Sequence, residues 1–193
     1  MIDQALIFLR DQINDYFMEI IHTKKVVLGH VVNQNGQTNV SEIGLTLINV
    51  EEESSLKNKN PYLKISEHNI AKINPPVYLN LYILIPAYFG DTEENYKEAL
   101  KNLSRVVNFF QGKPLFNHEN SPGLDEGIEM IHVDLVSLSF EQQNNLWSSL
   151  GGKYLPSVIY KVRLLEMVRE SMLSSGRRIE EVILKTTKME DEK

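Results

Sequence analysis

The residues closest to a reactive arrangement are His132 and Asp134, which stand two positions apart in the largely apolar segment 128–138. If this segment is a strand, both side chains lie on one face, where they can form a hydrogen bond or both point to solvent. A catalytic pair of this kind also needs a nucleophile within reach, and the sequence does not indicate one. We therefore assign no catalytic role to the pair.

No other grouping of side chains has the spacing of a catalytic or binding motif. The five histidines are dispersed, and His30 has no partner at the spacing of metal ligands. Motifs for phosphate loops, dinucleotide-binding turns, zinc hydrolases and serine hydrolases do not occur. We expect a protein that is not an enzyme and that has no cofactor and no metal site.

The composition is typical of one soluble globular domain. Of the 193 residues, 42% are apolar and 24% are charged. A net charge of −6 disfavours nonspecific binding to nucleic acid. Charged residues interrupt the first 21 positions, and no apolar run approaches the length that spans a bilayer. We expect a cytoplasmic product without nucleic-acid binding or direct membrane insertion.

Helical spacing of apolar residues predicts a first helix over residues 2–21, packed on a sheet. Ile7, Phe8 and Met18 fall outside the main apolar stripe and widen it. A broad apolar surface of this kind suits contact with a neighbouring subunit, so these three residues are candidates for a subunit interface. The alternative is that the helix is buried more deeply.

The strands are predicted from alternation and turn signals. Segments 26–32 and 42–51 flank an Asn-Gly pair and are expected to form a hairpin. Segment 77–85 is apolar on both faces and is expected at the centre of the sheet. A second long helix follows and ends at Gly112, and 128–138 is another strand.

The segment 52–74 is polar and shows no strong periodicity. Long irregular connections tend to be functional or disordered, so we interpret it as a contact loop, with a weakly ordered insertion as the alternative. Residues after Arg169 are expected to form a short helix or an arm with a mobile end.

The segment 139–168 combines a helix, a turn and a strand. Ser139 and Gln142 have the spacing of a reciprocal N-terminal cap, and Gly151 can end the helix with a positive φ angle. Pro156 precedes an alternating strand. The expected buried face of the helix consists of Phe140, Gln143, Leu146, Trp147 and Leu150.

Residues 146–151 (LWSSLG), 153–158 (KYLPSV) and Tyr160 resemble the closing signature of a known family, the tail-terminator or tube-cap proteins of phage-tail-like extracellular contractile injection systems. Residues 74–76, 103–110 and 133–139 extend the resemblance, which covers roughly 1–168 and leaves 169–193 as a C-terminal extension. It implies an α+β fold like that of phage tail-terminator domains, with a single mixed, mainly antiparallel β-sheet and flanking helices. The signature residues are Leu146, Trp147, Gly151, Tyr154, Pro156, Ser157 and Tyr160.

The resemblance implies a structural role without catalysis. A terminator of this kind forms a hexameric ring that caps the inner tube and the last sheath ring and ends polymerisation, so its partners are the tube and sheath proteins of the same particle. Candidate contacts in the long loop are Lys57, Lys59, Tyr62 and Lys64. The alternative is a small-ligand-binding or enzymatic α+β domain in which 52–74 acts as a lid.

Overall fold

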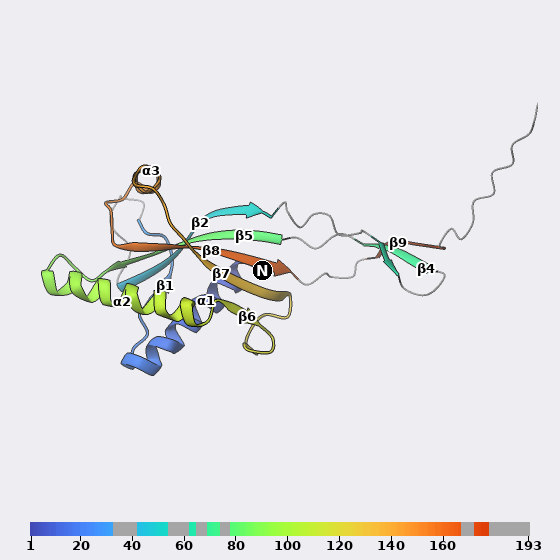
Figure 1. The fold of residues 1–193 in the computed structure, drawn as a ribbon, viewed down its shortest axis with the longest axis horizontal. Helices are drawn as coiled ribbons and strands as arrows, with labels where there is room; N and C mark the ends of the chain where they lie inside the picture. Colours follow the sequence, from blue (N-terminus) through green and yellow to red (C-terminus); the bar gives the residue numbers. More distant parts are fainter. Residues whose placement is uncertain (33–41, 54–61, 65–68, 74–77, 167–171, 178–193) are drawn as a thin grey trace, which may run out of the picture. The chain divides into compact units, whose positions relative to one another are not determined.

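The computed structural model describes residues 1–32, 42–53, 62–64, 69–73, 78–166 and 172–177. The chain forms two compact units, and each is described by itself (Figure 1). The larger unit contains residues 1–57 and 76–168, and the smaller contains 58–75 and 169–193.

A six-stranded sheet is the centre of the larger unit. All neighbouring strands are antiparallel except the first pair, β1 and β2, which is parallel. The prediction of a mixed, mainly antiparallel sheet with flanking helices is therefore confirmed, and β5 lies between β2 and β8 as expected of a central strand. In spatial order the strands are β1 (Val26–Leu28), β2 (Glu42–Glu52), β5 (Tyr78–Tyr88), β8 (Ser157–Glu166), β7 (Ile128–Val136) and β6 (Leu115–Asn117).

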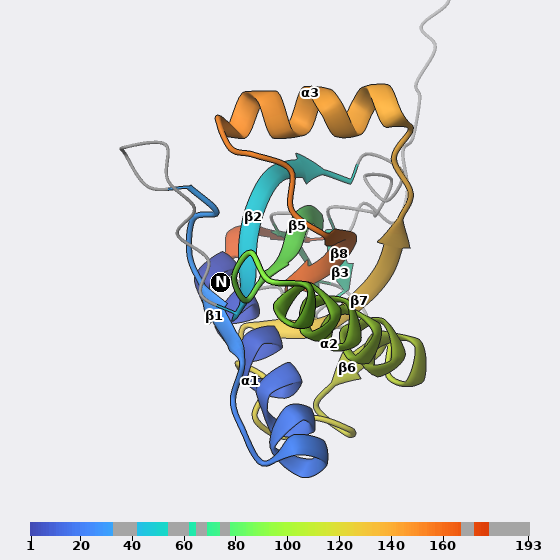
Figure 2. The ribbon, with the colours of Figure 1, turned by 90° about the vertical axis from the view of Figure 1, so that its left-hand side faces the viewer.

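Helices cover both faces of this sheet (Figure 2). The long helices α1 (Ile2–Ile21) and α2 (Glu93–Gly112) pack on one face, and the short helix α3 (Phe140–Leu150) packs on the other. Alternate residues of the central strands therefore enter different cores. In β5, for example, Ile83 and Ile85 lie in the larger cluster and Leu84 in the smaller one.

The predicted hairpin of segments 26–32 and 42–51 is wrong, because β1 and β2 run in the same direction, with Val26 opposite Ile43. Side chains alternate in parallel and antiparallel strands alike, so the apolar pattern did not specify the direction of pairing. The expected Asn-Gly turn lies in 33–41, outside the described residues.

Asn14 of α1 closes the outer edge of β1. Its amide nitrogen donates to the carbonyl of Val26 at 2.9 Å, and its oxygen accepts from the backbone N–H groups of Val26 at 2.9 Å and Lys25 at 3.0 Å. Asn14 and Val26 are both only 4% exposed. A side-chain amide has the same donor and acceptor as a peptide group, so Asn14 takes the place of a further strand.

The smaller unit contains a three-stranded antiparallel sheet of β3 (Tyr62–Lys64), β4 (Asn69–Ile73) and β9 (Met172–Arg177). The segment 52–74, interpreted as a loop without regular structure, thus contains two strands. Residues 172–177 form a strand where a short helix or an arm was expected. The larger unit extends to Val168, but residues 58–75, which the resemblance placed in the same domain, belong to the smaller unit together with 169–193.

Candidate functional site and interaction surfaces

His132 and Asp134 do form a hydrogen bond on the surface of β7, with 3.2 Å between Nδ1 and Oδ2. Arg163 of β8 donates to the same Oδ2, with its Nε at 3.1 Å. Burial by itself raises the pKa of Asp134, but the hydrogen bond from Arg163 and the charge of His132 outweigh it, so the net pKa is lowered. This arrangement is an ion cluster that joins two neighbouring strands.

The part of the chain that the structure describes contains no group of three or more histidine, aspartate or glutamate side chains that could hold a metal ion. Among the same residues, no helix combines the length and the apolar character needed to cross a bilayer.

The signature segment begins with the helix α3, whose N-terminus has the predicted capping box. The Ser139 hydroxyl accepts from the Gln142 N–H at 3.2 Å, and the Gln142 side chain accepts from the Ser139 N–H at 2.9 Å. Gly151 ends the helix with φ of 68°. At the next residue, Gly152, an added Cβ would lie 2.7 Å from Cγ2 of Val32, so a side chain does not fit there without a shift. The turn is therefore fixed by both glycines.

Trp147 attaches α3 to the sheet. It is 5% exposed and lies in a cluster with Val31, Leu84, Leu155 and Ile159. The Tyr154 ring stands edge-on to it, with 5.7 Å between ring centroids. The carbonyl of Pro156 then accepts from the backbone N–H of Ala87 at 2.9 Å, which places the start of β8 beside β5.

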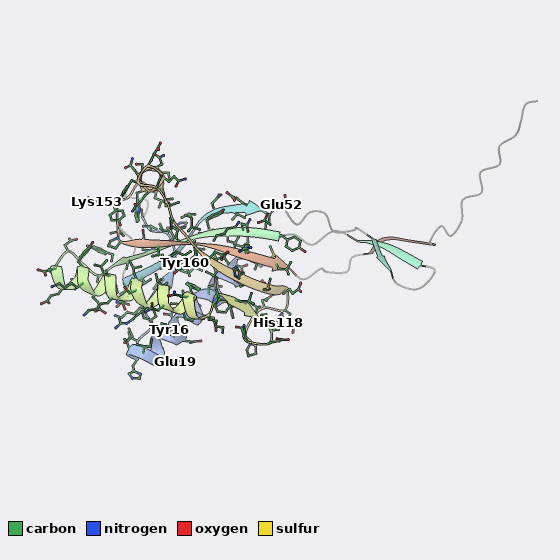
Figure 3. The ribbon with its side chains drawn as sticks, viewed as in Figure 1. Tyr16, Glu19, Glu52, His118, Lys153 and Tyr160 are labelled. Carbon is green, nitrogen blue, oxygen red and sulfur yellow. The ribbon has the colours of Figure 1, made fainter. Side chains whose placement is uncertain are left out.

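Tyr160 is the last residue of the signature and lies on the opposite face, against α2. Its ring centroid is 4.7 Å from that of Phe110, and Figure 3 shows its side chain within the larger unit. The hydroxyl is buried, and no described residue forms a hydrogen bond with it. Burial raises the pKa of Tyr160 to about 12, so the group is neutral and able to donate at physiological pH.

Phe140 does not belong to the buried face of α3 as predicted, because it is 92% exposed. It is the first residue of the helix, and Trp147 is the buried residue of the helix. Helical spacing correctly placed the two side chains on one stripe, but the packing against the sheet does not extend to the start of the helix.

The candidate subunit interface on α1 is only partly accessible. Ile7 and Met18 are each 40% exposed, whereas Phe8 is 8% exposed and packs edge-on against Phe116 of β6. Phe8 is thus a core residue, and its inclusion in an exposed patch was wrong. Ile20, near the C-terminal end of the same helix, is 48% exposed.

The candidate contact residues of segment 52–74 are only partly placed. Lys57 and Lys59 lie outside the described residues. Tyr62 and Lys64 are the two ends of β3, opposite Lys72 and Ile70 of β4. Lys57 directly precedes the smaller unit, and Lys59, Tyr62 and Lys64 belong to it.

Comparison with known proteins gives consistent matches over most of the chain. A family described as the Pvc16 N-terminal domain matches residues 6–181. No curated protein sequence matches. One similar solved structure is the PVC sheath/tube terminator of an extracellular contractile injection system in its extended state, with 14% identity, a TM-score of 0.56, and coverage of 93% of this chain and 63% of that chain.

A second similar structure is the tube-terminating cap of the anti-feeding prophage, with 11% identity and a TM-score of 0.56. The match covers 91% of this chain and 59% of that chain. The chain thus spans less than two thirds of the length of either protein. At this level of identity, the likeness establishes that the fold is shared.

Proposed function

This chain belongs to the Pvc16 N-terminal domain family, and we propose from that membership that it is a structural terminator of a contractile injection system. In this role it caps the end of the inner tube and the last sheath ring and so ends polymerisation. The observation that carries the proposal is the match of nearly the whole fold to a sheath/tube terminator. The role requires no catalytic step and no cofactor.

We propose that the active form is a ring of six copies. To end a helical stack, a ring must match the growing face on one side and offer no matching face on the other. Copies that associate head-to-tail around a rotation axis close into such a ring. The exposed apolar residues Ile7, Met18 and Ile20 of α1 are the candidates for contact between copies. Partly exposed apolar side chains on one helix suit an interface that is buried only on assembly.

The smaller unit is our candidate for contact with tube or sheath protein. The segment 58–75 of this unit begins just after Lys57 and includes the other candidate contact residues, Lys59, Tyr62 and Lys64. Sites that recognise partners often lie on segments held by a rigid scaffold. Assembly is proposed to take place in the cytoplasm, after which the protein remains part of the particle.

Deletion of the gene is expected to leave tube and sheath proteins at normal levels but to yield particles of uncontrolled length. The reason is that a terminator acts on the end of the polymer and supplies nothing needed to make a subunit. Electron microscopy of purified particles measures the length distribution, and complementation with the intact gene is the control. Particles of normal length and intact tips after deletion would contradict the proposal.

Replacement of residues 54–70 by a short Gly-Ser linker is expected to impair capping while the larger unit stays folded. The replaced segment contains β3 and the first two residues of β4, but no strand of the six-stranded sheet. Far-UV circular dichroism and thermal unfolding check the fold, and electron microscopy checks the particles. If this variant restores normal length in the deletion strain, the contact surface lies elsewhere, with α1 or the residues after Arg169 as the next candidates.

A further inference from the structure

A hollow of about 360 Å³ lies at the end of the six-stranded sheet where α2 begins. Its walls are the connection from β5 to α2, the first turns of α2 and residues 154–156, which lead into β8. Figure 1 shows the end of β5, the start of α2 and the start of β8 at the same end of the larger unit. The N–H of Ala87 donates to the carbonyl of Pro156 at 2.9 Å, so the two sides of the hollow are joined by a backbone hydrogen bond.

Two exposed aromatic rings from different parts of the chain line this hollow. Tyr96 of α2 is 52% exposed and Tyr154 is 57% exposed. Tyr96 precedes the buried Ala99 by three residues, and both residues lie on the side of α2 that lines the hollow. The ring of Tyr154 is held edge-on by Trp147. The faces of such rings are electron-rich and attract cations.

The charged side chains that line the hollow are acidic. They are Asp91 and Glu93, and among the described lining residues none is basic. The Asp91 carboxylate accepts from the Tyr88 hydroxyl at 3.2 Å and forms no ion pair with a described residue. This hydrogen bond and the charge of the carboxylate raise the pKa of Tyr88. Lys153, labelled in Figure 3, lies on the neighbouring turn and does not line the hollow.

Two basic residues near the hollow are already paired. Lys97 forms an ion pair with Glu93, one helical turn earlier. Lys25 lies over the ring of the lining residue Phe89 and forms an ion pair with Glu42 at 2.8 Å. The N–H groups at the start of α2 contribute a partial positive charge, which the acidic first turn of the helix offsets. The aspartate therefore remains available for a cation beside two open aromatic rings.

We propose that this hollow binds an arginine side chain on the surface of a different protein. A guanidinium group stacks on aromatic rings and donates a planar fork of N–H groups to a carboxylate. Tyr96 and Tyr154 would contact its faces, and Asp91 would accept from its edge. Arginine and tyrosine are also the residue types that carry much of the affinity of protein interfaces.

A second copy of this chain is a less suitable source of the arginine. Every arginine whose side chain the structure describes is already bonded within its own chain: Arg10 to Asp11, Arg105 to Asn102 and Arg163 to Asp134. The net charge of −6 also favours a basic partner at long range. The proposal does not depend on the capping function.

The test uses the full-length protein and an end-blocked peptide with a single arginine between two pairs of glycines. We expect saturable binding with a Kd of about 1–10 mM, as for one side chain in an open site. Amide shifts in NMR spectra should be centred on residues 91–96 and 153–156, and binding should weaken as salt is added. The fluorescence of Trp147, whose ring contacts Tyr154, gives a second measure. No saturable shift at about 50 mM peptide, or shifts centred elsewhere, would overturn the proposal.

Two matched peptides test the chemistry of the occupant. Citrulline has the shape of arginine without its charge, and the citrulline peptide should bind about tenfold more weakly or worse. The lysine peptide keeps the charge but lacks the planar fork, and it should bind about threefold more weakly or worse. Equal binding of the citrulline peptide would show that the hollow does not recognise a cation. Equal binding of the lysine peptide would contradict the assignment to arginine.

Two variants test the site itself. Tyr96→Ala removes an exposed ring, and Asp91→Asn removes the charge while keeping an acceptor for the Tyr88 hydroxyl. Each should weaken binding of the arginine peptide about fivefold or more. The matched control is Glu94→Gln, which removes an equal charge from the first turn of α2 at an exposed position that does not line the hollow. Its affinity should stay within about twofold of the wild type, because an exposed charge outside the site is screened.

All three substituted positions are exposed, so the thermal unfolding of these variants should be close to that of the wild type. Unchanged binding in either Tyr96→Ala or Asp91→Asn would overturn the proposal. Light scattering checks the remaining source of the arginine. Dissociation of protein oligomers by the arginine peptide, but not by the citrulline peptide, would replace the proposal by contact between copies of this chain.

Discussion

Replacement of Trp147 by alanine is expected to lower the free energy of unfolding by about 3–5 kcal/mol, the usual cost of removing a large buried aromatic side chain. Trp147 is 5% exposed and is the buried residue of α3. Its loss would leave a cavity bordered by Leu84 and Ile159 and would weaken the contact between α3 and the sheet. Chemical denaturation followed by far-UV circular dichroism measures the change.

Phe140→Ala is the matched control, since it removes an aromatic ring from the same helix at a position that is 92% exposed. We expect this variant to change stability by no more than about 0.5 kcal/mol. A loss of less than about 1 kcal/mol in Trp147→Ala would contradict the core role of the tryptophan and indicate a role at the surface or in an interface.

Asn14→Leu is expected to have a comparable effect, about 3 kcal/mol, although it removes no apolar contact. Leucine has nearly the size of asparagine but leaves the N–H and C=O groups of Val26 without partners in a buried place. A buried backbone group that loses its partner costs about 1–3 kcal/mol. Urea denaturation gives the change in stability, and the amide of Val26 should exchange faster with solvent.

The control for this variant is Asn108→Leu, which makes the same substitution at an exposed position of α2. It should leave stability within about 0.5 kcal/mol of the wild type. If Asn14→Leu is as mild as the control, the outer groups of Val26 find water or other partners, and the edge of β1 is not closed by Asn14 alone.

Elements with a strong signal in their own sequence were predictable. The two long helices follow from apolar spacing, the capping box of α3 from Ser139 and Gln142, and the central place of β5 from its two apolar faces. These features depend on residues that are close together in the chain. The role of Trp147 as a core residue followed for the same reason.

Features that depend on distant partners were not predictable from the same patterns. The three strands of the smaller unit are short, and β4 pairs with β9 about 100 residues later in the chain. Asn14 is a polar residue in the middle of a helix, and nothing in its neighbourhood indicates that it bonds to Val26. The burial of Phe8 and the exposure of Phe140 depend on how far the neighbouring elements extend.

The separation of β4 and β9 has a consequence for the timing of biosynthesis. Residues 69–73 leave the ribosome long before residues 172–177, whereas a domain generally folds once its whole sequence has emerged. The small sheet therefore cannot be completed on a nascent chain until translation has passed residue 177, after every strand of the larger sheet has been made. If the small sheet carries the contact with tube or sheath, an unfinished polypeptide is unable to stop a growing tube, and premature termination by nascent chains is avoided.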